Sequence, residues 1–207
     1  AEGEILVLMG LSGSGKSTLL RGVNALNPVV RGEVRVSDGA SMVSVTQADP
    51  ETLRKLRLSR IAMVFQQFGL LPWRSVRENV GLGLELGGMS AAERRDRVDT
   101  QLELVNLTQW ADRRVGELSG GMQQRVGLAR AFATEAPILL MDEPFSALDP
   151  LIRAKLQDEL LDLQATLKRT IVFVSHDLDE AFKIGNRIAL MEGGRIVQCG
   201  TARQIIA

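Results

Sequence analysis

A glycine-rich loop, Gly10–Thr18, lies between a short apolar run and a helical pattern, and it constrains the fold more than any other feature of this sequence. Its letters, GLSGSGKST, fit the pattern G-x-x-x-x-G-K-[ST]. Glycines are needed there because backbone N–H groups must turn inward around phosphate oxygens, where side chains would obstruct them. The helix that follows adds a dipole that favours an anion. The sequence therefore predicts a phosphate-binding loop.

Every residue of this loop is a candidate ligand of a nucleotide. Lys16 can reach the β- and γ-phosphates, and the Ser17 hydroxyl can bind Mg²⁺. A flexible Gly/Ser turn that fits the pattern by chance is the alternative, and the strand–loop–helix context argues against it. The candidate ligands are Gly10, Leu11, Ser12, Gly13, Ser14, Gly15, Lys16, Ser17 and Thr18.

Short apolar runs alternate with helical patterns along most of the chain. Such runs suit strands that are buried on both faces of a parallel sheet. The runs are Ile5–Met9, Ile61–Phe65, Ile138–Met141 and Thr170–Val174, followed by a late hairpin at 187–197. The helical patterns are Ser17–Asn24, Ser90–Leu104, Gly120–Ala133, Leu151–Leu167 and Leu178–Lys183. The alternation predicts an α/β domain with a mostly parallel sheet.

The stretch 73–135 breaks this alternation, because its pattern is almost entirely helical. We expect a helical subdomain at 73–135, inserted between two parts of one α/β nucleotide-binding core, 1–72 and 136–207. Residues 32–50 are rich in Ser, Val and Asp and predict an exposed β excursion from that core.

Composition and charge exclude several classes of protein. Lys plus Arg and Asp plus Glu each total 25, so the formal net charge is zero and no basic field attracts nucleic acid. The one cysteine, Cys199, cannot form an internal disulfide and suits a reducing compartment. The sequence has no apolar run long enough to span a bilayer and no signal-peptide pattern at its start. We expect a soluble protein of the cytosol that does not bind nucleic acid.

Two carboxylates directly follow the apolar run 138–141. Asp142 and Glu143 are expected at the carboxyl end of a strand, where ligand sites of open parallel sheets lie. Asp142 would hold Mg²⁺ through water, and Glu143 would polarise the attacking water. Alone, the pair could equally be surface acids that cap the next helix. The phosphate loop earlier in the chain favours the catalytic interpretation.

A second anion-binding site is predicted at the start of the helical pattern 120–133. Ser119 can cap this helix, and Gly120 and Gly121 leave N–H groups uncovered at its start. This site belongs to the helical insert and not to the sheet. A plain helix cap is the alternative interpretation of the same residues.

Six ordered motifs give the chain a resemblance to the ATPase subunits of ABC transporters. The motifs are the phosphate loop, Gln66 after Met63–Phe65, Leu118–Gly121 (the signature segment), Asp142–Pro144, Ser146–Asp149 and His176. The resemblance covers the whole chain. It implies an α/β fold of the P-loop NTPase class, an ABC-type nucleotide-binding domain that hydrolyses ATP with Mg²⁺.

In that family, two subunits associate head to tail, and each ATP lies between one phosphate loop and the partner's signature segment. The resemblance therefore implies that Ser119–Gly121 contact the γ-phosphate in trans and that Asp149 crosses the dimer interface. Gln66 would sense Mg²⁺ and the attacking water. His176 would bind the γ-phosphate and position that water together with Glu143.

Longer segments resemble the quaternary-amine importers, which take up glycine betaine, proline betaine or choline. These segments are 63–68, 145–153, 157–160 and 170–181, and Gln67–Arg74 is most similar to the choline type. The resemblance implies an integral-membrane permease as partner, docked on Phe68–Val76, and indirectly a substrate-binding protein. The ATPase would lie peripherally on the cytoplasmic face of the inner membrane. The sequence does not identify the solute, because the ATPase never touches it.

Four alternatives stay open beside this interpretation. A soluble ABC ATPase of DNA repair would need long coiled coils between Lys16 and Ser119, which are only 103 positions apart. The ABC ATPases of translation join two cassettes, and this sequence holds one. A non-hydrolytic regulatory module is disfavoured by the intact Glu143 and His176. An ABC importer ATPase for a different solute also stays open, because the solute is chosen by the permease and the substrate-binding protein.

The chain also departs from the family pattern. The family begins with two or three strands and an aromatic residue that stacks on adenine. This sequence has no tyrosine, and no aromatic residue precedes Phe65. We expect the N-terminal strands to be missing from this sequence, because the run Ile5–Met9 would otherwise lack a sheet neighbour. Some members of the branch carry regulatory domains beyond the position of residue 207.

Overall fold

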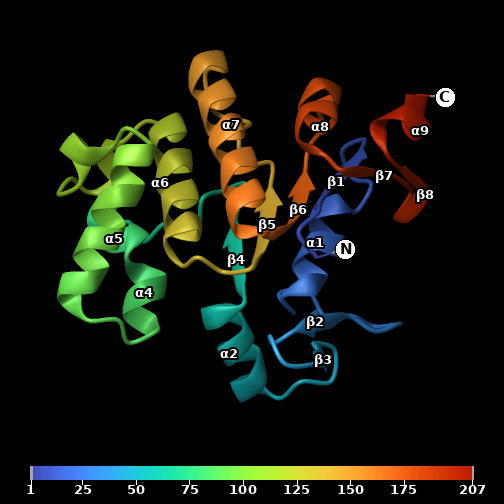
Figure 1. Ribbon diagram of the computed structural model, residues 1–207, viewed down its shortest axis with the longest axis horizontal. Coiled ribbons are helices and arrows are strands. Elements are labelled where there is room, and N and C mark those ends of the chain that lie inside the picture. The colour runs from blue at the N-terminus through green and yellow to red at the C-terminus, as the bar shows by residue number, and fades with distance from the viewer. Residues whose placement is uncertain (1, 207) are drawn as a thin grey trace.

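The computed structural model describes residues 2–206, and within them the centre of the fold is a six-stranded sheet (Figure 1). Its strands lie in the order β4-β5-β6-β1-β7-β8. Neighbours from β4 to β7 pair in parallel, and β8 pairs antiparallel with β7, which confirms the expected mostly parallel sheet. The strands are β1 (Ile5–Gly10), β4 (Ile61–Val64), β5 (Ile138–Asp142), β6 (Thr170–Val174), β7 (Arg187–Glu192) and β8 (Arg195–Gly200).

Strand β1 lies inside the sheet, between β6 and β7. Leu6 pairs with Val172 on one side and with Arg187 on the other. The argument that the first apolar run would lack a sheet neighbour is therefore wrong. Both partner strands come from the C-terminal part of the chain, so no local pattern around β1 indicates them.

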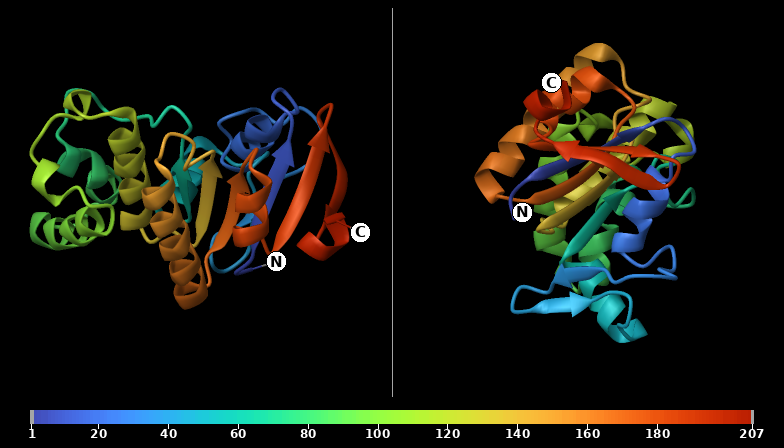
Figure 2. Two further views of the ribbon diagram at one scale, coloured as in Figure 1. Left: turned by 90° about the horizontal axis from the view of Figure 1, so that it is seen from above. Right: turned by 90° about the vertical axis from the view of Figure 1, so that its right-hand side faces the viewer.

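Different helices cover the two faces of the sheet (Figure 2). Side chains of α6, α7 and α8 pack on one face, and α1, α2 and the hairpin β2–β3 pack on the other. Successive side chains of β1 point to opposite faces of the sheet, so Val7 lies in the apolar core on the first face and Leu8 in the core on the second. These elements are α1 (Lys16–Val23), β2 (Arg35–Ser37), β3 (Met42–Ser44), α2 (Pro50–Ser59), α6 (Gly120–Ala133), α7 (Pro150–Leu167) and α8 (Leu178–Ile184).

Between β4 and β5 the chain forms helices that extend the molecule beyond the β4 edge of the sheet (Figure 1). Val80, Val98 and Leu102 of these helices are buried in the same apolar core as Phe132 of α6 and Leu139 of β5. The helical segment and one face of the sheet thus share a continuous core. The helices are α3 (Val76–Val80), α4 (Leu82–Leu86), α5 (Ala91–Leu104) and two short 3-10 helices, Thr108–Trp110 and Val115–Glu117.

Several elements were not predicted from periodicity. Helix α2 is the longest of them, and the residues at its start are typical of a helix N-terminus. Asp49 caps it by accepting a hydrogen bond from the Thr52 N–H at 2.8 Å, and Pro50 occupies its first turn. The expected β excursion is present as the antiparallel pair β2–β3. Helices α3, α4 and α9 (Ala202–Ile206) are too short for a helical period to stand out.

Candidate functional site

The phosphate loop joins the end of β1 to the start of α1. The backbone is left-handed at Gly13 and Gly15, with φ of +79° and +94°, a region that glycine enters at little cost. A Cβ at Gly10 would overlap the carbonyl oxygen of Met191 in β7. The loop therefore needs glycine for its conformation at two positions and for close packing on β7 at a third.

The Lys16 ammonium lies within the curve of this loop. Its Nζ donates hydrogen bonds to the carbonyl oxygens of Gly10 at 2.8 Å and Leu11 at 2.9 Å. The side chain is only 6% exposed, so these bonds compensate for most of the hydration that the ammonium loses. Phosphate oxygens that enter the loop would give the same ammonium anionic partners.

Asp142, at the end of β5, is completely buried beside the first turns of α1. Its Oδ1 accepts a hydrogen bond from Ser17 Oγ at 2.7 Å, and its Oδ2 lies 3.2 Å from Arg21 Nη2. The guanidinium compensates for the charge of a carboxylate that would be costly to bury alone. The hydroxyl and the carboxylate together present the oxygen ligands that Mg²⁺ prefers. No pattern in the sequence indicated Arg21.

Glu143, Gln66 and His176 meet at the carboxyl ends of three adjacent strands. Glu143 Oε2 lies 3.2 Å from His176 Nδ1 and 3.5 Å from Gln66 Nε2. Glu143 follows β5, His176 follows β6 and Gln66 follows β4, and these strands are neighbours in the sheet. Parallel pairing therefore brings together three residues that are far apart in the sequence.

The Glu143 backbone has a left-handed conformation, with φ of +47°. Such a conformation costs a residue with a side chain about 1–2 kcal/mol. It persists where surrounding bonds impose it, and it is concentrated at functional sites. Here the Glu143 N–H donates to the carbonyl oxygen of Val174 at 3.1 Å.

The phosphate loop and these three side chains share one cavity of about 480 Å³. Its polar lining and its position at the carboxyl ends of the parallel strands suit a nucleotide phosphate chain. The lining residues are Ser12, Gly13, Gly15, Lys16, Ser17, Thr18, Gln66, Glu143 and His176. Gly10, Leu11 and Ser14 of the loop instead line a neighbouring hollow against β7 and β8.

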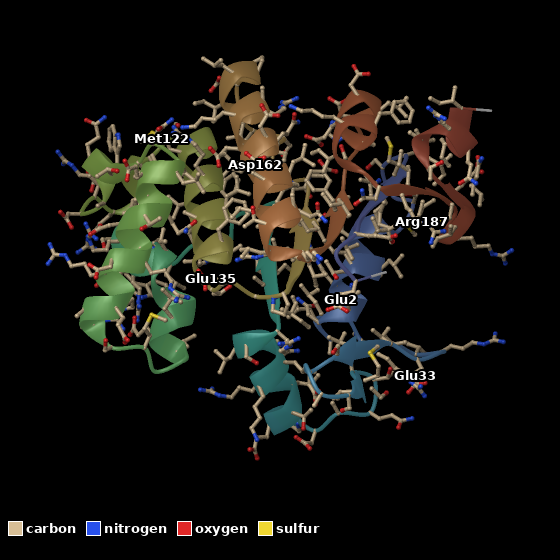
Figure 3. All side chains as sticks on the ribbon, viewed as in Figure 1. Glu2, Glu33, Met122, Glu135, Asp162 and Arg187 are labelled. Carbon is tan, nitrogen blue, oxygen red and sulfur yellow. The ribbon has the colours of Figure 1, made fainter. Side chains whose placement is uncertain are left out.

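Ser119, Gly120, Gly121 and Asp149 lie outside this cavity, at the starts of α6 and α7. Ser119 Oγ accepts a hydrogen bond at 3.3 Å from the N–H of Met122, which Figure 3 labels in the first turn of α6. The Asp149 carboxylate likewise caps α7. Within one chain, both side chains therefore act as helix caps. Their contact with a nucleotide in trans stays a prediction.

Arg130 of α6 is a second residue that sequence analysis missed. Its guanidinium donates to the carbonyl oxygens of Phe68 at 2.8 Å and Gly69 at 2.7 Å. Both residues have positive φ and directly follow the Gln66–Gln67 pair. Burial lowers the pKa of Arg130 from its ordinary value. The only sequence signal was an arginine inside the otherwise apolar pattern 126–133.

Comparison with known families agrees with this site. A family model described as ABC transporter matches residues 1–146. The chain belongs to the ABC transporter family. A solved dimeric ATP-binding cassette in a post-hydrolysis state, bound to ADP and Pi, has a TM-score of 0.90 and 38% identity, over 97% of this chain and 86% of that one. The predicted ABC-type P-loop fold is confirmed.

Within residues 2–206, no helix is both long and apolar enough to cross a membrane.

Relatives with curated names are also similar over nearly the full chain. The glycine betaine/proline betaine transport system ATP-binding protein ProV of Escherichia coli is 54% identical over 99% of this chain and 50% of its own length. The trimethylamine N-oxide transport system ATP-binding protein TmoW of Ruegeria pomeroyi is 50% identical, over 100% of this chain and 59% of its own. This chain spans about half the length of the curated relatives it matches.

The resemblance to quaternary-amine importers is thus confirmed, with one difference in detail. The choline transport ATP-binding protein OpuBA of Bacillus subtilis is 42% identical over 100% of this chain and 52% of its own length. This is a lower identity than the 54% of the betaine relative. Gln67–Arg74, which suggested the choline type, is too short a segment to decide between the two.

The packing of the loop on β7 leads to a stability prediction. Gly10→Ala should lower the free energy of unfolding by about 3 kcal/mol, because the added methyl group forces the Met191 carbonyl to move. Among the described residues, a Cβ at Gly13 would meet nothing within 4 Å. Gly13→Ala should therefore lower the free energy of unfolding by only about 1–2 kcal/mol, which is the cost of placing an alanine in a left-handed conformation. Urea denaturation measures both, and equal losses would contradict a constraint from Met191.

Proposed function

We propose that this chain is the ATP-hydrolysing subunit of an importer for a quaternary amine such as glycine betaine, proline betaine or choline. The observation that carries the proposal is the Glu143 carboxylate, which lies between Gln66 and His176 in the cavity that the phosphate loop lines. A carboxylate beside a phosphate-binding loop suits the removal of a proton from water that attacks a phosphoryl group. The names of the relatives support the solute class.

Mg²⁺ fits the residues around Asp142. Its carboxylate and the Ser17 hydroxyl are 2.7 Å apart and would hold the ion, with Gln66 as a further oxygen ligand. Mg²⁺ keeps several water ligands and commonly binds through one or two protein groups together with substrate phosphates. When bound, the ion neutralises negative charge on the phosphates.

The protein residues then have separate tasks in hydrolysis. The N–H groups of the loop and the Lys16 ammonium bind the β- and γ-phosphate oxygens and hold them in place. Glu143 accepts the proton of the attacking water, so that the water oxygen bonds to the γ-phosphorus as the bond to ADP breaks. His176, whose Nδ1 lies 3.2 Å from Glu143 Oε2, would hydrogen-bond the γ-phosphate and position the water together with Glu143. The products are ADP and phosphate.

A head-to-tail homodimer completes the proposed site. Ser119 and Gly120 are exposed at the start of α6, where helix N–H groups attract an anion. Because they lie outside the cavity of their own chain, they are free to meet the γ-phosphate that a partner chain holds. Asp149 would cross the same interface. The solved relative, which is dimeric and bound to ADP and Pi, supports a dimer.

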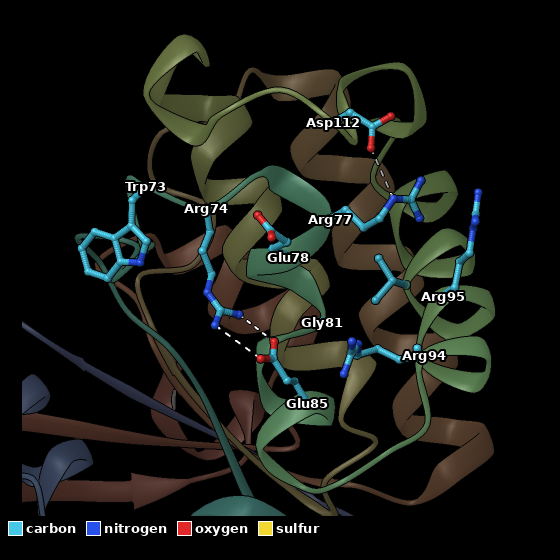
Figure 4. A pocket seen from close by; sticks show the side chains of 11 residues that line it. Trp73, Arg74, Arg77, Glu78, Gly81, Glu85, Arg94, Arg95 and Asp112 are labelled. Atoms are coloured by element: carbon cyan, nitrogen blue, oxygen red, sulfur yellow. Dashed lines mark hydrogen bonds and ion pairs between the residues drawn. The ribbon is translucent and has the colours of Figure 1, made fainter.

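A hollow in the helical segment supports docking on a membrane permease (Figure 4). It has a volume of about 780 Å³, and Trp73 at its margin is 65% exposed. Arg74 lies in its wall and forms an ion pair with Glu85 at 2.7 Å. Exposed tryptophan and arginine are favourable anchors for a partner. We place the protein peripherally on the cytoplasmic face of the inner membrane, coupled through the permease to a substrate-binding protein.

Capture from detergent-solubilised membranes tests this partner. The full-length protein should retain an integral-membrane permease of a quaternary-amine transport system, identified by mass spectrometry. Trp73→Ala should reduce the retained permease about tenfold or more, as for a hot-spot residue. Trp110→Ala is the matched control, because Trp110 packs partly against the core of the subunit. Retention of DNA-repair or ribosomal proteins instead would favour a soluble ABC ATPase.

Glu143→Gln tests the proposed general base. The amide keeps the shape of the side chain but cannot accept a proton from water, so kcat should fall by about 10²–10⁴-fold. ATP binding should persist, and the full-length protein should accumulate as an ATP-bound dimer. Single-turnover hydrolysis and size-exclusion chromatography measure the two effects. Near-normal hydrolysis would remove Glu143 from this role.

Mixed dimers of Lys16→Met and Ser119→Asp test the assembly of the site in trans. The new carboxylate keeps the helix cap but repels the γ-phosphate. With both changes in one chain, one composite site lacks its lysine and the other has a repelling signature segment, so neither is intact. With the changes in different chains, one site carries both and the other is whole. Hydrolysis should therefore appear only in the second arrangement, and equal activity in both would exclude contact in trans.

A further inference from the structure

Gln124, early in α6, has a buried side chain that the proposed mechanism does not use. It is 0% exposed, although a carboxamide needs hydrogen-bond partners when it leaves water. Its Nε2 donates to the carbonyl oxygen of Glu143 at 3.2 Å and to Ser146 Oγ at 3.4 Å. Its Oε1 accepts from the Ala147 N–H at 2.9 Å. Both ends of the carboxamide therefore bind the same segment, 143–147.

That segment begins with the left-handed residue that carries the proposed base. The N–H of Glu143 is bonded to Val174 of β6, and its carbonyl oxygen accepts from Gln124 and, at 3.1 Å, from Ser146 Oγ. The two peptide groups that flank the Glu143 Cα are thus held from opposite sides. They thereby fix the direction of the Cα–Cβ bond from which the carboxylate extends, and the contacts of the carboxylate with His176 and Gln66 select its side-chain rotamer.

A second contact joins α6 to the same segment. A Cβ at Gly121 would lie 2.9 Å from the carbonyl oxygen of Ala147, so the first turn of α6 packs directly against this backbone. The signature segment ends in that turn. The start of α6 therefore links the proposed trans-acting Ser119 to the segment 143–147 through the contacts of Gly121 and Gln124.

We propose that Gln124 is a positioning residue for the general base. It holds the Glu143 backbone so that the carboxylate faces the attacking water, and it links this orientation to the place of the signature segment. Gln124 contacts neither water nor nucleotide in this role and acts only through Glu143. The role rests on the proposed ATPase function.

Gln124→Met in the full-length protein tests the role. Methionine has a similar length and fills the same space, but it cannot donate to Glu143 or accept from Ala147 as an amide does. We expect kcat to fall about 10- to 100-fold, as for a slightly misplaced catalytic group. The KM for ATP and the ATP-bound dimer should be retained, because the phosphate loop and the signature segment are unchanged.

Gln123→Met is the matched control, since it changes the same residue type on the same helix. Gln123 Nε2 donates to the carbonyl oxygen of Leu118 at 3.1 Å, away from Glu143. This variant should keep the kcat of the wild-type protein. Equal kcat values for the two variants would overturn the proposal. So would a fall in kcat that comes with loss of the ATP-bound dimer, because that pattern indicates a damaged helix and not a misdirected base.

Gln124→Asn keeps the inference testable if the methionine variant does not fold. Asparagine keeps a neutral carboxamide, but it is one methylene shorter and cannot reach both the Glu143 carbonyl and the Ala147 N–H. A wild-type kcat in this variant would overturn the positioning role. The wild-type protein, assayed alongside, separates the two proposals. An inactive wild type rejects the ATPase function itself, whereas an active wild type with unimpaired Gln124 variants rejects only the role of Gln124.

Discussion

Parallel pairing of the central strands is the constraint on which the rest of the site depends. Asp142 pairs with Val174, and Leu8 pairs with Val174 on the other side of β6, so these strands end at nearly the same level. The groups that follow the strand ends are thereby gathered along one edge of the sheet. They are the phosphate loop after β1, Gln66 after β4, the two acids after β5 and His176 after β6.

Buried polar contacts then join the parts that the sheet alone does not fix. Asp142 is bonded to Ser17 and Arg21 of α1, so the end of β5 and the helix behind the phosphate loop keep a fixed distance. Arg130 and Gln124, both on α6, bind the backbone after Gln66 and at Glu143. Breaking the contacts of Asp142 or Gln124 would leave a buried polar group unpaired, which costs free energy, so these contacts hold the helices to the strand ends.

Local patterns in the sequence predicted those features whose structure depends on residues close by in the chain. The buried strands, the phosphate loop and the acids after β5 each follow from a period or a spacing, and Lys16, Glu143 and His176 do line one cavity. The flanking partners of β1 and the side chains of Arg21 and Gln124 could not be predicted this way. Their partners lie far away in the sequence, and a single arginine or glutamine in a helix has many satisfactory environments. The left-handed backbone of Glu143 leaves no trace in composition.

The two carbonyl oxygens that hold the Lys16 ammonium have a consequence for selectivity. A ligand does not meet a vacant cation but must replace partners that the cation already has, so only the difference between the two sets of bonds favours binding. A neutral nucleoside offers oxygens no better than those carbonyls and gains nothing from the exchange. A polyphosphate brings full negative charge, so replacing the carbonyl oxygens by its oxygens is favourable. In its proposed role, the loop would therefore discriminate by charge before any part of the base is recognised.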